Sequence, residues 1–143
     1  MIAHSATCVA VGRRGLLIEG APGTGKSSLA LALIDRGAQL VGDDGVLLEA
    51  DGPHLFAHPH PNTRGLLEVR NVGLVPVDPV GRVPVALLIV LDGEAPRFIE
   101  QAEQAERAGM SLPLVRLWPD SPVLALRAEM ALAMHGLDAP AMG

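Results

Sequence analysis

Hydrophobic residues near the start of the chain change from strand-like to helix-like spacing and back again. Two short runs rich in Val, Leu and Ile, at 7–11 and 15–19, are joined by a Gly-Arg turn and predict two strands. Within 27–36 the apolar residues recur at helical spacing, and Gly37 stands where a C-terminal cap belongs. Residues 38–42 then predict another strand.

The rest of the chain predicts mainly strands. Three apolar stretches are expected to form them: 43–59 as hairpins around two Asp-Gly pairs, 65–77 as two short strands, and 83–92 as one buried strand. The polar segment 98–108 predicts a helix or a mobile connection, and 111–119 a short extended piece. A last helix is expected at about 122–135, followed by a frayed tail at 136–143.

Composition is that of a single globular domain over residues 1–143. Hydrophobic residues make up 49% and aromatic residues only 2%, so we expect a core of Leu, Val, Ile and Ala. A net charge of −5 argues against nucleic-acid binding, and no apolar run approaches the ~18 residues of a membrane-spanning helix. The start lacks the charge-first layout of a signal peptide, so a cytoplasmic protein is expected.

The apolar neighbours of Cys8 favour a core residue over a nucleophile.

The stretch "GAPGTGKS" matches the phosphate-binding pattern G-x-x-x-x-G-K-[ST]. An apolar strand precedes it and an apolar helix follows, which is the context that the motif requires. Glycines let the backbone wrap closely around phosphate groups, and the helix N-terminus adds a partial positive charge. The residues predicted to bind a nucleotide are Gly20, Ala21, Pro22, Gly23, Thr24, Gly25, Lys26 and Ser27.

Lys26 is the only lysine in a chain that carries ten arginines. Because this chain uses arginine wherever a generic positive charge suffices, the compact ammonium at position 26 is expected to have a specific task, that of reaching the outer phosphates. The hydroxyl of Ser27 is expected to ligate Mg²⁺. A phosphate loop predicts nucleotide binding but does not define a reaction.

Two adjacent carboxylates, Asp43 and Asp44, end the strand that follows the first helix. If this strand lies beside the phosphate-loop strand, both carboxylates reach the edge of the sheet at which ligands bind. One carboxylate can then hold a metal, and the other can accept a proton from an attacking hydroxyl. The alternative is that Asp44-Gly45 is only a hairpin turn. The phosphate loop upstream favours the catalytic interpretation.

Glu68 and Arg70 are two residues apart on a predicted strand and therefore share a face. They can complete a metal site and steady a transferred phosphate, or they can form a surface salt pair, and both interpretations are open. The histidines of the Pro-rich loop, His54, His58 and His60, lack a regular metal-ligand spacing.

Together these motifs resemble the catalytic domain of the HPr kinase/phosphorylase family. The family pattern is a phosphate loop, a helix ending in Arg-Gly, a strand ending in Asp-Asp and a later Glu-Ile-Arg-Gly signature. The matching stretches here are Arg36-Gly37, Asp43-Asp44 and Glu68-Val69-Arg70-Asn71. The resemblance implies an α/β fold, a phosphate-loop domain related to phosphoenolpyruvate carboxykinase. It also implies an ATP- and Mg-dependent kinase that phosphorylates a serine of an HPr-like phosphocarrier protein.

The same resemblance assigns roles residue by residue. The implied catalytic residues are Asp44, Lys26, His4 and Arg97, the implied magnesium ligands are Ser27 and Glu68, and Asp43 and Arg70 are further candidates. Asp44 matches the acid/base that accepts the serine proton. His4 lies near the position of an active-site histidine, with one extra residue intervening, and Arg97 is matched to a late active-site arginine across a shortened region.

Several positions depart from the family pattern. Ser28 stands where a Glu is usual, and Asn71 replaces the Gly of the signature. Residues 112–122 lack the Gly-Arg-Asn that long members carry for dephosphorylation, so kinase activity is favoured over phosphorylase activity. Because the loop begins at residue 20, we expect a truncated form without the N-terminal domain of the long members. Those relatives also suggest a homo-oligomer.

Two other functions are considered. The chain can be a non-catalytic module that senses ATP and changes the affinity of a partner. It can also be a small-molecule kinase, which would need a lid with several arginines. Only Arg97, Arg107 and Arg116 lie in a plausible stretch, so this alternative ranks last.

Overall fold

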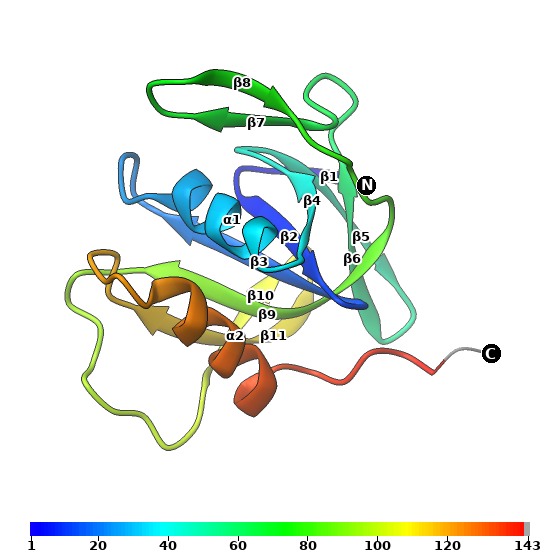
Figure 1. Ribbon diagram of the computed structural model, residues 1–143. Helices are drawn as coiled ribbons and strands as arrows, with labels where there is room; N and C mark the ends of the chain where they lie inside the picture. The colour runs from blue at the N-terminus through cyan, green and yellow to red at the C-terminus, as the bar shows by residue number, and fades with distance from the viewer. Residues whose placement is uncertain (142–143) are drawn as a thin grey trace.

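A mixed sheet with two helices on one face forms the body of the protein (Figure 1). This computed structural model describes residues 1–141 of the chain. The strands are β1 (Ile2–His4), β2 (Thr7–Val11), β3 (Arg14–Gly20), β4 (Gln39–Gly42), β5 (Val46–Asp51), β6 (His54–Pro59), β7 (Leu66–Val69), β8 (Gly73–Pro76), β9 (Val83–Leu91), β10 (Glu103–Arg107) and β11 (Met110–Leu117), and the helices are α1 (Lys26–Asp35) and α2 (Leu124–His135).

The strand directions bring the predicted motifs to one edge of the sheet. β3 and β11 both pair with β9 in parallel, and β2 pairs in antiparallel with β3 on one side and β4 on the other. β4 therefore runs in the same direction as β3, although β2 lies between them. The expectation that the strand of Asp43 lies beside the phosphate-loop strand is wrong in this respect. Both strands nevertheless end at the same edge, which we call the carboxyl edge.

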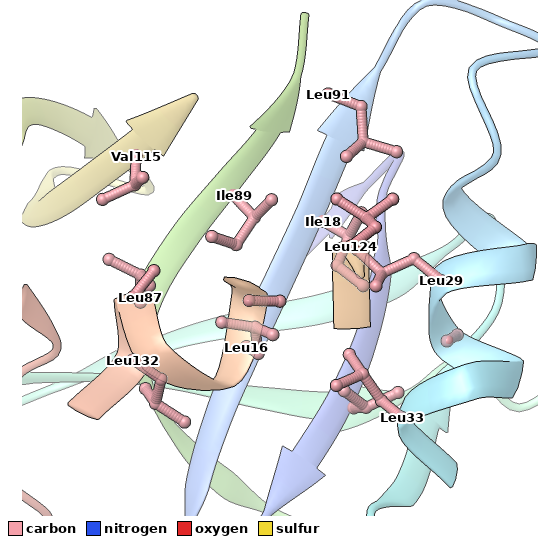
Figure 2. Packing of buried hydrophobic residues seen from close by; sticks show 14 of the residues in the cluster. Leu16, Ile18, Leu29, Leu33, Leu87, Ile89, Leu91, Val115, Leu124 and Leu132 are labelled. Atoms are coloured by element: carbon pink, nitrogen blue, oxygen red, sulfur yellow. The ribbon is translucent and has the colours of Figure 1, made fainter. Parts of the chain in front are cut away.

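One face of the sheet is covered by both helices. Figure 2 shows Leu29 and Leu33 of α1, together with Leu124 and Leu132 of α2, packed over one face of the sheet, α1 toward β2 and α2 toward β9. Alternate residues of the strands point to this face, among them Leu16, Ile18, Leu87 and Ile89. The helices are thereby fixed on the same side of the sheet.

The other face is closed by the arm β1-β5-β6, which joins the sheet where β6 pairs with the beginning of β9. The buried residues on this side are aliphatic apart from Cys8, as they are on the helix side, which confirms the prediction of an aliphatic core. Cys8 is completely buried, and burial raises the pKa of its thiol to about 12. It is a core residue, as its apolar neighbours predicted.

The end of α1 follows the sequence prediction. Gly37 has a φ of 110°, and its N–H donates to the carbonyl of Ile34, while the N–H of Ala38 donates to the carbonyl of Leu33. This pair of bonds is the Schellman arrangement that glycine favours after a helix. The chain is thereby turned into β4, which leads to the two aspartates.

Two local predictions are wrong. Residues 98–108 contain the edge strand β10, which pairs with β11, where a helix or mobile connection was expected. An edge strand tolerates a polar sequence because its outer side meets water. The Asp44-Gly45 turn does not make a hairpin either, because β4 pairs with β2 while β5 pairs with β1 and β6. The pair Asp51-Gly52 does join a hairpin, formed by β5 and β6.

The segment after α2 runs back along the sheet. The N–H of Leu137 donates to the carbonyl of Ala86, and Arg14 donates to the carbonyl of Leu137 at 3.2 Å. Residues 142–143 of the tail that was expected to fray lie outside the described residues. Within residues 1–141, neither helix has the length and hydrophobicity needed to cross a bilayer.

We predict that Leu33→Ala lowers the free energy of unfolding by about 2–5 kcal/mol, because Leu33 is fully buried between α1 and the sheet. Leu31→Ala on the same helix is the matched control. Since Leu31 is 41% exposed, this change should cost less than about 1 kcal/mol. Urea unfolding followed by circular dichroism measures both values, and equal losses would contradict the packing described here.

Candidate active site

The loop between β3 and α1 has the backbone geometry of an open anion site. Gly23 and Gly25 have φ values of 81° and 99°, in the left-handed region that glycine adopts without strain. Gly25 is the N-cap of α1 and no side chain caps the helix, so the first N–H groups of α1 are left for another partner. Helix N-termini of this kind bind phosphate through N–H groups and the helix dipole.

Lys26 is held against the loop that it is predicted to serve. Its Nζ donates to the carbonyl oxygen of Gly20 at 2.9 Å and lies 3.5 Å from that of Ala21. The side chain is half-buried, and it lines a pocket of about 540 Å³ at the carboxyl edge.

Asp43 connects three elements through its buried carboxylate. Oδ1 accepts hydrogen bonds from the hydroxyl of Ser27 at 2.6 Å and from the hydroxyl of Thr7 at 3.1 Å. Oδ2 accepts a bond from the backbone N–H of Glu68 at 2.9 Å. The carboxylate thus joins α1, β2 and β7 at the point where the pocket lies, and it orients the Ser27 hydroxyl.

Thr7 is a site residue that the sequence reasoning missed. Besides donating to Asp43, its hydroxyl accepts the backbone N–H of Asp44 at 3.2 Å. Among residues 1–141, Thr7 and Asp43 are the only buried polar or charged residues. The available signal was the single hydroxyl in the otherwise apolar strand "TCVAV".

Asp44 faces the opposite way from its neighbour. It is exposed, has a φ of 59°, which Asp tolerates better than most residues, and lines the pocket. The pocket brings together most of the predicted site: Lys26, Ser27, Asp44, Glu68 and Arg70, with Ser5 beside them. Cations and carboxylates from three parts of the chain therefore share one cavity.

Two predicted catalytic residues lie outside this group. The Nε2 atom of His4 is 2.7 Å from a carboxylate oxygen of Glu19, and His4 does not line the pocket, although the next residue does. Arg97 lines a separate pocket with Arg116, Trp118 and Arg127. The structure therefore brings neither side chain to the cavity that contains Lys26 and Asp44.

Glu19 immediately precedes the phosphate loop and receives three hydrogen bonds. His4 lies at 2.7 Å, and the guanidinium of Arg107 donates to both carboxylate oxygens, at 2.9 and 2.8 Å. Burial alone would raise the pKa of Glu19, but the bonds from Arg107 and His4 outweigh burial and lower the pKa below its usual value. The end of the strand β3 is thereby tied to β10 and β1.

His54 and His58, which were expected in a Pro-rich loop, lie in the strand β6 and have other partners. His58 lies 2.8 Å from a carboxylate oxygen of Glu49, and His54 packs edge-on against Phe56. In the described part of the chain, no group of three or more His, Cys, Asp or Glu side chains is arranged to hold a metal. A cation in the pocket would therefore need ligands besides protein carboxylates.

Comparison with known proteins decides the family. The sequence model of the HPr Serine kinase C-terminal domain matches residues 1–81. The chain belongs to this family. The HPr kinase/phosphorylase of Streptococcus uberis is 35% identical over 116 residues, which cover 72% of this chain and 37% of that protein. The HPr kinase/phosphorylase of Mycoplasmopsis pulmonis is 41% identical over 71 residues, 50% of this chain and 23% of that protein.

The fold of the HPr serine kinase domain extends beyond the matched sequence. The solved structure of the Hpr(Ser) kinase/phosphatase from Coxiella burnetii superimposes with a TM-score of 0.82 at 25% identity, covering 93% of this chain and 95% of that one. This confirms the predicted α/β fold of the HPr kinase catalytic domain. The chain spans less than half the length of the curated relatives it matches.

One departure from the family signature has a structural reason. Asn71, which replaces the signature glycine, turns the chain after β7 with a φ of 70°. Asn is one of the few residues other than Gly that adopt the left-handed region readily. The hairpin β7-β8 that carries Glu68 and Arg70 therefore keeps its turn.

We predict that Thr7→Val lowers the free energy of unfolding by about 1–3 kcal/mol, because the buried carboxylate of Asp43 and the N–H of Asp44 each lose a partner. Thr7→Ser keeps the hydroxyl and serves as the control. Chemical denaturation should find the serine variant more stable, although valine fills the site better. The reverse order would contradict a role for the hydroxyl bonds.

We also predict that Arg107→Gln destabilises the protein by about 1–3 kcal/mol at pH 7, because Glu19 loses its charged partner. A lowered folded-state pKa gives stability that is present above the unfolded pKa and lost as pH falls through the folded pKa. The difference between wild type and variant should therefore shrink in acid, measured by urea unfolding between pH 7 and 3.

The matched control for Arg107→Gln is Arg82→Gln. Arg82 pairs with Glu49 and Asp51 but is 42% exposed, so its loss should cost less than the loss of Arg107. A loss for Arg107→Gln that is small and independent of pH would mean that the Glu19 pair contributes nothing to stability.

Proposed function

We propose that this protein is an ATP- and Mg-dependent protein serine kinase that phosphorylates an HPr-like phosphocarrier protein. The observation that carries the proposal is the single pocket lined by Lys26, Ser27, Asp44 and Glu68. Membership of the HPr serine kinase family and the structural likeness to the Hpr(Ser) kinase/phosphatase support the same conclusion. We propose further that residues 1–143 work as one catalytic domain.

The donor set of the pocket suits a magnesium ion. Ser27 and Glu68 offer a hydroxyl and a carboxylate, and Mg²⁺ in phosphate-transfer sites is commonly held by one or two protein oxygens together with phosphate oxygens and water. When bound, the ion would neutralise charge on the phosphates. The bond from the Ser27 hydroxyl to Asp43 presents the oxygen lone pairs of Ser27 to the pocket.

The loop and Lys26 would bind the phosphate chain. The uncapped N–H groups of α1 and the ammonium at the loop supply positive charge where negative charge accumulates on the transferring group. Arg70 lines the same pocket, and its guanidinium adds to this positive charge. These groups stabilise the negative charge on the transferring phosphoryl group and form no covalent bond with it.

Asp44 would act as the general base. Its exposed carboxylate accepts the proton of the substrate serine while the serine oxygen bonds to the terminal phosphorus and the bond from that phosphorus to the bridging oxygen of ADP breaks. Asp43, whose oxygens are occupied by three hydrogen bonds, is a positioning residue in this scheme. Catalytic roles for His4 and Arg97 remain predictions of the family resemblance.

The preferred direction of the reaction and the oligomeric state belong to the same proposal. The absence of Gly-Arg-Asn in residues 112–122 favours phosphorylation over dephosphorylation of the carrier. A homo-oligomer in the cytoplasm is proposed on the resemblance to longer relatives.

The small-molecule kinase is disfavoured by the arginines it would need. Arg107 of β10 is paired with Glu19 of β3, and Arg116 of β11 is paired with Glu103 of β10 and with Asp92 directly after β9. Arginines held in a sheet cannot close over a nucleotide as a lid does. A non-catalytic ATP sensor stays the second candidate, because it needs the same loop and no base.

We predict that Asp44→Asn abolishes phosphate transfer while ATP affinity stays within about threefold of wild type, because the amide removes only the proton acceptor. Asp35→Asn, on the exposed end of α1, is the matched control and should leave transfer unchanged. Labelled ATP with a panel of phosphocarriers and phosphosite mapping measures transfer, and calorimetry measures binding.

The outcomes separate the candidates. Transfer by Asp44→Asn at the wild-type rate would remove Asp44 from the mechanism. ATP binding by the wild type without transfer to any serine would favour the sensor.

A further inference from the structure

A second pocket, of about 330 Å³, lies at the carboxyl edge beyond β9. Its lining includes Arg97 from the loop after β9, Trp118 directly after β11, and Arg127 from the first turn of α2. Apart from the catalytic role that the family resemblance implies for Arg97, the reaction proposed above assigns no task to this group of side chains. We call it the Arg-Trp pocket.

Trp118 is an unusual residue in this chain. It is the only tryptophan of the chain. Among the described residues, the core contains no aromatic side chain, and Trp118 itself is 39% exposed. Its Nε1–H donates to the carbonyl of Ala95 at 2.7 Å, which fixes the orientation of the ring. The guanidinium carbon of Arg127 lies 5.7 Å from the ring centroid. A rigid, partly exposed ring beside a cation is a platform on which a flat ligand can stack.

Charge in the Arg-Trp pocket is partly uncompensated. Arg116 is paired with Asp92 and Glu103. Within residues 1–141, Arg97 and Arg127 form no ion pair with a carboxylate. Their two guanidinium groups therefore give the pocket a net positive character.

The Arg-Trp pocket is close to the phosphate loop. Gly20, Leu91 and Leu117 are the last residues of three adjacent parallel strands and stand in one row across the sheet. Because neighbouring strands are about 4.8 Å apart, Leu117 lies roughly 10 Å from the start of the loop. Arg127 belongs to α2, which covers the same face of the sheet as α1 (Figure 1, Figure 2).

The two pockets lie on opposite sides of the loop along the sheet edge. Asp44 follows β4, which lies beyond β2 as seen from β3, and Glu68 belongs to β7, which contacts β4, whereas the Arg-Trp pocket lies on the β9 side of β3. A nucleotide with its terminal phosphate near Asp44 has its phosphate chain along the loop. Because the loop lies between the two pockets, a nucleoside at the other end of that phosphate chain would extend toward β9 and β11.

We propose that the Arg-Trp pocket binds the purine nucleoside of the phosphate donor. In this arrangement the base stacks on Trp118 and Arg127, and Arg97 lies near the ribose and the inner phosphate. Nucleobases stack on tryptophan rings and on arginine guanidinium planes in many nucleotide-binding proteins. This assignment rests on the proposed function, because it requires that a nucleotide occupies the loop.

Trp118 reports on the experiment directly, because its fluorescence is the only tryptophan signal of the chain. The full chain is titrated with MgATP and, separately, with magnesium tripolyphosphate, which has the phosphates but no base. We expect ATP to change the Trp118 emission and tripolyphosphate to leave it nearly unchanged. Trp118→Leu and Arg127→Gln should each weaken ATP binding about tenfold in calorimetry, as expected for the loss of one stacking partner.

The control variant is Arg13→Gln, at the opposite end of β3, which removes the same charge without touching the Arg-Trp pocket. All three variants should bind tripolyphosphate as the wild type does, which also shows that they are folded. If Trp118→Leu and Arg127→Gln bind ATP as tightly as the wild type, and ATP leaves the wild-type emission unchanged, the Arg-Trp pocket does not bind the nucleoside. This result leaves the proposed function intact. If a phosphocarrier quenches the Trp118 emission and ATP does not, the nucleoside assignment is wrong and the pocket is a docking site for the protein substrate. Binding of neither ATP nor tripolyphosphate overturns the proposed function as well.

Discussion

The buried carboxylate of Asp43 is the contact on which the site depends. It accepts hydrogen bonds from the hydroxyl groups of Ser27 and Thr7 and from the backbone of Glu68. An almost fully buried carboxylate destabilises the fold unless its oxygens accept hydrogen bonds. Moving any one of these partners away from Asp43 would therefore raise the free energy of the folded state. Through this one group, the helix that follows the phosphate loop, the strand β2 and the hairpin β7-β8 keep a common geometry.

The adjacent pair of aspartates divides its work because of backbone geometry. Directly after β4, Asp43 is turned into the protein, and the left-handed φ of Asp44 turns the next side chain into the pocket. The N–H of Asp44 is bound to the same Thr7 hydroxyl that supports Asp43. The exposed carboxylate is therefore aimed by the buried one, which suits a proton acceptor that must not itself be tied up in hydrogen bonds.

Local patterns in the sequence predicted the elements that carry the site. The phosphate loop, the α1 helix with its Gly37 cap and the strands around it have strong local signals, since glycine conformation and apolar spacing act over a few residues. What the sequence did not predict depends on contacts between distant residues. The polar stretch with Glu103 to Arg107 is a strand because it pairs with β11 and because Arg107 reaches Glu19, 88 residues away. The role of Thr7 likewise depends on Asp43, which only the folded sheet brings near.

The pocket has walls of two different kinds. One wall is the edge of the main sheet, while the other is the two-stranded ribbon β7-β8, which pairs with no strand of that sheet among the residues described. The ribbon is attached by the buried side chain of Leu67 and by the bond from Glu68 to Asp43. Glu68 and Arg70 thus lie on a ribbon outside the main sheet, and the width of the cavity depends on how this ribbon sits against the core. Small rotations there would open or narrow the mouth while the phosphate loop stays still.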